Sequence, residues 1–68
     1  MTYIEAIAKW NVGGAVYFEL MRDAESYFYK VQGAVIPFRA DKDDEAMTIV
    51  ETIIKLQFPE AKVTKEVL

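Results

Sequence analysis

The sequence predicts one small α+β domain over residues 1–68. An antiparallel sheet of about three strands should pack with two helices in the order α-β-β-β-α, with a possible short strand at the C-terminal end. Apolar residues recur at helical spacing in the first and last thirds of the chain. Aromatic and β-branched segments separated by turn residues fill the middle third. A length of 68 residues leaves room for one core, and 53% hydrophobic content argues against disorder.

The first segment, MTYIEAIAKWNVGG, predicts a helix. Thr2 and Glu5 have the spacing of a capping box, in which each side chain satisfies a free backbone N–H near the helix start. At about 100° per residue, Glu5 and Lys9 share one side. The opposite side carries Tyr3, Ile4, Ala6, Ile7 and Trp10. Gly13 and Gly14 would then end the helix, because glycine readily adopts the left-handed conformation.

The middle segment, AVYFELMRDAESYFYKVQGAVIPF, predicts strands. The segment 22–25, RDAE, is the expected first turn, which places Met21 opposite Ser26. Because side chains alternate along a strand, this register gathers six apolar residues on one face. They are Val16, Phe18, Leu20, Tyr27, Tyr29 and Val31.

A second turn at Gln32 and Gly33 should lead into a third strand. That strand adds Ala34, Ile36 and Phe38 to the apolar face. Pro37 has no backbone donor, so we expect this strand to be short and to lie at an edge of the sheet. The last segment, AKVTKEVL, alternates valines with polar residues, which indicates a short edge strand or a frayed tail.

The segment DKDDEAMTIVETIIKLQFP has the clearest helical pattern of the chain. Asp41 is the expected N-cap, the acidic residues after it suit the positive end of the helix dipole, and Pro59 stops the helix. About half of the circumference is apolar and should cover the apolar face of the sheet. This stripe consists of Ala46, Met47, Ile49, Val50, Ile53, Ile54 and Leu56.

The residue types argue against an enzyme. The chain has no Cys and no His, so the commonest general base and metal ligand are missing, and the single serine has no histidine to activate it. Asp41, Asp43 and Glu45 have the spacing of the first ligands of a calcium loop. Such a loop needs Gly where Ala46 stands and Glu where Thr52 stands. We therefore expect no catalytic, metal or cofactor site.

The charge balance argues against nucleic acid and membranes as partners. Eight basic and eleven acidic residues give a net charge of −3, the wrong sign for binding phosphates non-specifically. No apolar run approaches the roughly 20 residues of a membrane-spanning helix. The N-terminal segment also lacks the basic and then apolar pattern of a secretory signal, so we expect a cytoplasmic protein.

The second face of the predicted sheet is the candidate functional surface. The register sends five residues to it: Tyr17, Glu19, Met21, Phe28 and Lys30. Several large apolar groups on one face exceed what a small soluble monomer usually leaves in water. We interpret this face, with an acidic rim, as the partner-binding site of a non-enzymatic protein-interaction module. Such a module would be a small regulator, inhibitor or accessory protein of phage or bacterial type. Its partner would be another protein or a second copy in a homodimer.

Two alternatives stay open. A nucleic-acid-binding domain could use the outward aromatic side chains and Lys30, although the net charge opposes it. A pocket for a small ligand could lie between the first helix and the sheet, near Trp10.

Part of the chain resembles a known family. The stretch YFEL with Asp23 after it, the aromatic strand of Tyr27 and Tyr29, and FPEAKV after the helix resemble the YegP-like small domains of unknown function. The resemblance covers about residues 17–63. The glycine of that family's first turn and its Gly-Tyr-Ser-Ser-Lys stretch before the helix are missing here. The resemblance implies a strand, an aromatic second strand and a helix, and no activity.

Overall fold

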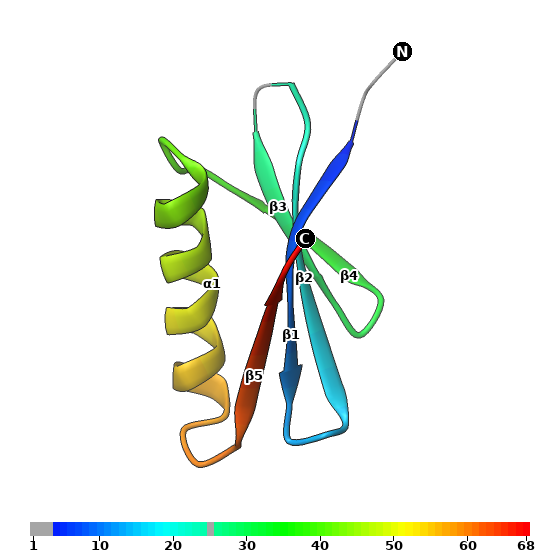
Figure 1. Cartoon of the computed structure of the whole chain (residues 1–68), viewed down its shortest axis with the longest axis vertical. Helices are drawn as coiled ribbons and strands as arrows, with labels where there is room; N and C mark the ends of the chain where they lie inside the picture. The colour runs from blue at the N-terminus through cyan, green and yellow to red at the C-terminus, as the bar shows by residue number, and fades with distance from the viewer. Residues whose placement is uncertain (1–3, 25) are drawn as a thin grey trace.

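The computed structural model describes residues 4–24 and 26–68 and is a five-stranded antiparallel sheet with one helix against one face (Figure 1). The elements are β1 (Glu5–Val12), β2 (Val16–Arg22), β3 (Tyr27–Val31), β4 (Ala34–Phe38), α1 (Asp43–Gln57) and β5 (Val63–Val67). The strand order is β4-β3-β2-β1-β5, so α1 carries the chain from one edge of the sheet to the other. The α+β class and the antiparallel sheet are confirmed, whereas the strand count and the helix at the start of the chain are wrong.

The segment predicted as the first helix is strand β1. It pairs with β2 on one side and β5 on the other. The register shifts between Ala6 and Ala8, which makes Ile7 the extra residue of a β-bulge. Ile7 and Ala8 are both buried, so the bulge interrupts the alternation of a strand and leaves apolar residues at helix-like spacing. Thr2 of the expected capping box lies outside the described residues, as does Tyr3.

Gly13 and Gly14 form the turn between β1 and β2 rather than the end of a helix. Both have positive φ angles, +64° and +74°, which glycine adopts without a steric penalty. The backbone N–H of Gly14 donates to Oδ1 of Asn11 at 2.8 Å, and that of Gly13 donates to the carbonyl of Lys62 at 2.8 Å. The turn is therefore fixed to the segment that leads into β5.

The hairpin of β2 and β3 is present with a register that differs from the prediction. Met21 lies opposite Phe28, not Ser26, because the turn is built by residues 23–26, of which residue 25 is not described. The backbone N–H of Asp23 donates to the carbonyl of Ser26 at 3.0 Å, and the carboxylate of Asp23 accepts from the N–H of Ser26 at 2.9 Å. The displacement is by two residues, so each side chain keeps its predicted face.

The remaining strand predictions are confirmed. Gln32 and Gly33 form the second tight turn, with φ angles of +49° and +82°. Among the described residues, β4 is the edge strand next to β3, which explains how Pro37 is accommodated. β5 forms the opposite edge, as one of the two readings of the final segment predicted.

Helix α1 supplies one side of the core. Ala46, Val50 and Ile54 are buried, and they share one cluster with the sheet residues Trp10, Phe18, Leu20 and Tyr29. Of the predicted stripe, Met47 and Ile53 also pack against this cluster, whereas Ile49 is half-buried outside it and Leu56 is 78% exposed. The prediction of Asp41 as N-cap is wrong, because Lys42 occupies that position and makes no side-chain capping hydrogen bond. The acidic first turn is as expected.

The helix covers only one face of the sheet (Figure 1). It packs mainly against β1 and β2, so β4 and β5 are largely exposed. No helix among residues 4–24 and 26–68 is long and apolar enough to cross a membrane.

Candidate functional site

The face of the sheet turned away from α1, called the outer face below, carries all five residues predicted to bind a partner. Phe18, Leu20 and Tyr29 belong to the core beneath α1. Because neighbouring residues in a strand point to opposite faces, the residues between and beside them point outward. These are Tyr17, Glu19 and Met21 from β2 and Phe28 and Lys30 from β3.

The five side chains differ in how much of each is accessible. Tyr17 is 57% exposed, and Lys30 is also exposed. Glu19 and Phe28 are half-buried, whereas Met21 is only 9% exposed. The cross-strand neighbours of Met21 are Ala6 and Phe28, which explains its burial on a face without a covering helix. Tyr17 is therefore the aromatic side chain that this face presents most openly.

A row of four charged residues crosses the outer face. Glu66 pairs with Lys9, Lys9 with Glu19, and Glu19 with Lys30, on the adjacent strands β5, β1, β2 and β3. The signs alternate, so the row has no net charge. Opposite charges directly across a strand pair favour the register by about 0.2–1 kcal/mol.

The sequence prediction missed Lys9 and Glu66 as members of this face. The sequence pattern predicts a helix around Lys9, and it predicts either a strand or a tail for the final segment that contains Glu66. A strand interpretation of residues 5–12 would have put Lys9 beside Glu19.

Next to this row lies an open hollow of about 500 Å³. Its lining comes from β1, β2 and β5: Lys9, Trp10, Asn11, Tyr17, Glu19, Thr64, Lys65 and Glu66. The exposed ring of Tyr17 and side chains of both charges border it. An aromatic group with mixed polar neighbours is typical of a contact surface for another protein.

On the covered face, Glu51 of α1 joins the helix to the sheet. The indole N–H of Trp10 donates to Oε2 of Glu51 at 3.2 Å, and Nζ of Lys65 lies 3.0 Å from the same oxygen. Burial alone would raise the pKa of the Glu51 carboxyl. The hydrogen bonds from Lys65 and Trp10, together with the positive charges of Lys65 and Lys55, outweigh this effect and lower that pKa.

We expect this carboxylate to contribute to the acid stability of the protein. A group whose pKa is lower in the folded state stabilises the fold above its unfolded pKa of about 4.5, and loses that contribution as the pH falls through the folded value. Between about pH 5 and pH 3, Tm should therefore fall less in Glu51→Gln than in the parent. The exposed Glu60→Gln is the control. Equal slopes in all three proteins would contradict the role given to Glu51.

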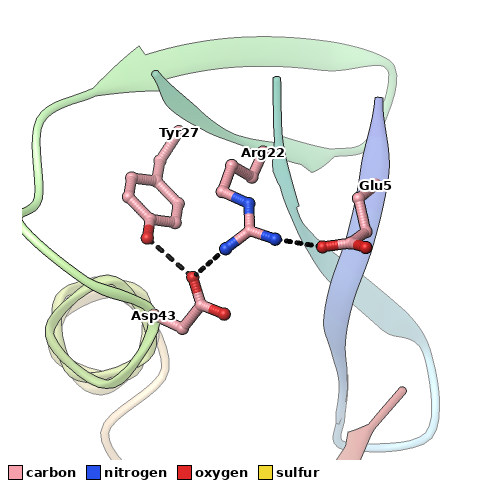
Figure 2. Close-up of polar contacts among 4 residues, drawn as sticks. All are labelled: Glu5, Arg22, Tyr27 and Asp43. Atoms are coloured by element: carbon pink, nitrogen blue, oxygen red, sulfur yellow. Dashed lines mark hydrogen bonds and ion pairs between the residues drawn. The ribbon is translucent and has the colours of Figure 1, made fainter. Parts of the chain in front are cut away.

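A second polar cluster connects β1, β2, β3 and α1 (Figure 2). Arg22 lies between the carboxylates of Glu5 and Asp43, and its Nη1 donates to Oδ1 of Asp43 at 2.8 Å. The hydroxyl of Tyr27 donates to the same oxygen at 2.6 Å. The first acid of α1 therefore holds the helix start onto the sheet, and the acidic run lies on the covered side of the sheet.

The sequence raises three further candidates: the acidic run at the helix start, a pocket near Trp10 and a metal site. The acidic run at the start of α1 borders a very open hollow of about 430 Å³, lined by Arg22, Tyr27, Asp41, Lys42, Asp43 and Asp44. The pocket predicted near Trp10 requires a first helix beside the sheet, but residues 5–12 form strand β1 instead. Trp10 is almost fully buried, and a hollow of about 200 Å³ lies beside it between α1 and β5. Among the described residues, no group of three or more acidic side chains is arranged to hold a metal ion.

Comparison with protein-family models, curated proteins and solved structures found no significant match to this chain. The resemblance to YegP-like domains stays a prediction.

Proposed function

We propose that this protein is a non-enzymatic interaction module, a small regulator, inhibitor or accessory protein, whose outer face binds another protein chain. The observation that carries the proposal is the uneven covering of the sheet. α1 packs on one face, while the outer face presents the 57% exposed ring of Tyr17 beside an open hollow. Exposed aromatic residues with a polar surround are enriched where proteins associate.

The charges of the outer face favour a protein over a nucleic acid. Lys9 and Lys30, the two lysines of the charge row, each lie across from the acid Glu19. Phosphate binding depends on Lys and Arg side chains whose charge is not already compensated. An alternating row instead suits a protein surface that offers charges of both signs.

Site-specific cross-linking in the cell tests the proposal. A photoreactive aromatic amino acid is placed at position 17 on the outer face or, as the control, at the exposed Thr48 on α1. We expect irradiation to yield a covalent adduct with a protein from position 17 and none from position 48. Adducts with nucleic acid at position 17 would favour the alternative, and no difference between the two positions would contradict the proposal.

A further inference from the structure

We propose that the protein chain that covers the outer face is a second copy of this chain. The inference rests on the proposed function, because it names the occupant of the same surface. The observation that supports a second copy is the order of the charges across the outer face. Across the strands β5, β1, β2 and β3 the row is negative, positive, negative, positive, from Glu66 through Lys9 and Glu19 to Lys30. Reading this row backwards exchanges every sign, so the row is complementary to its own reverse.

A twofold axis parallel to the strands, midway between β1 and β2, produces that reversal. Two outer faces related by this axis place Lys9 opposite Glu19 of the second copy and Glu66 opposite Lys30 of the second copy. Each of these contacts occurs twice, as symmetry requires of an isologous interface. A twofold axis perpendicular to the strands would place each charge opposite its own equivalent, which is repulsive. The charges therefore select one orientation.

The neighbouring rows fit the same orientation. On one side of the charge row, Met21 would face Ala6 of the second copy, so apolar side chains meet apolar ones. On the other side, Tyr17 would face Asn11 of the second copy, an aromatic group against an amide. Sheets that pack face to face lie about 10 Å apart with their strands within about 30°, a gap that a lysine and a glutamate can bridge together.

The contact area that the outer face offers is small, so the association should be weak. Five strands about 4.8 Å apart and three outward rows about 7 Å apart give a face of roughly 20 Å by 20 Å. This is below the roughly 800 Å² that each partner buries in a stable complex of standard size. We expect a concentration-dependent dimer with a Kd between about 1 μM and 1 mM, weakened by salt because part of its attraction is between exposed charges.

Charge reversal tests this geometry. Lys9→Glu places acids opposite acids in a homodimer, and Glu19→Lys places lysines opposite lysines. Sedimentation equilibrium should show a Kd at least about tenfold higher for each variant alone. In an equimolar mixture every contact of the row again joins opposite charges, so the mixed dimer should form at least as well as the parent dimer. Lys55→Glu and Glu60→Lys, which change the net charge equally away from the outer face, should leave the parent Kd unchanged.

Reversal at position 9 or 19 also puts like charges beside each other within one sheet, so circular dichroism must first show that each variant folds. Lys30→Glu and Glu66→Lys repeat the design at the ends of the row, where each has one charged neighbour instead of two. A parent that stays monomeric at about 1 mM, or mixtures that fail to restore the dimer from folded variants, would overturn the inference. Cross-links from position 17 to a different protein would then leave the proposed function standing, and an absence of any protein adduct would remove both.

Discussion

Replacing Phe18 with alanine should lower the free energy of unfolding by about 3–5 kcal/mol. Phe18 is 0% exposed in the middle of β2, beneath α1. Its ring centroid lies 6.1 Å from that of Tyr29 and 6.4 Å from that of Phe58, which packs against it edge-on. Loss of the ring removes these contacts and leaves a cavity between two rigid elements that cannot close it.

The effect should be visible in an unfolding experiment. Small domains have a total stability near the lower end of about 5–15 kcal/mol, so Phe18→Ala should keep at most about 2 kcal/mol and unfold at a much lower urea concentration than the parent, as followed by far-UV circular dichroism. Tyr17→Ala is a matched control, because Tyr17 is the preceding residue of the same strand and points to the outer face. It should change the stability by less than about 1 kcal/mol. A Phe18→Ala protein that unfolds at nearly the urea concentration of the parent would show that β2 is not packed under α1 as described.

The alternation of β2 and β3 is the part of the fold that sequence predicts best. The alternation predicts that Phe18, Leu20 and Tyr29 lie on the covered face, and they are buried there. The predicted faces are right although the predicted register is wrong, because the turn at residues 23–26 displaces the pairing by two residues, an even number. The Asp23 carboxylate that accepts the N–H of Ser26 fixes this turn, and its sequence pattern is too common to single out beforehand.

Strand β1 at the start of the described chain is not predictable from local sequence alone. Local spacing cannot distinguish a bulged strand from a helix when the bulge places two buried residues, Ile7 and Ala8, side by side. What decides between them is pairing with β2 and β5, which are remote contacts. The same error hid half of the charge row, since Lys9 and Glu66 meet only when β5 returns to β1. The five residues predicted on the outer face could be found from the sequence because all of them lie in the hairpin of β2 and β3, whose strands are close together in the chain.

Asp43→Ala should be the most destabilising substitution among the polar contacts, by about 1–2 kcal/mol. Its Oδ1 accepts hydrogen bonds from Tyr27 at 2.6 Å and from Arg22 at 2.8 Å (Figure 2). Arg22 and Asp43 are each 39% exposed, so their ion pair itself contributes little. Most of the loss should come from Tyr27, a residue only 7% exposed whose hydroxyl would lose the acceptor that Asp43 provides.

Asp44→Ala separates this contact from the general effect of an acid at the helix start. Asp44 also lies in the first turn of α1, so its loss removes a similar interaction with the helix dipole, about 0.5 kcal/mol. The hydrogen bond to Asp43 raises the pKa of Tyr27, so this phenol should titrate at lower pH in Asp43→Ala, as followed by NMR of its ring. In a Tyr27→Phe background, removal of Asp43 should cost no more than removal of Asp44. An unchanged difference between the two acids in that background would mean that Asp43 acts through Arg22 and Glu5 instead.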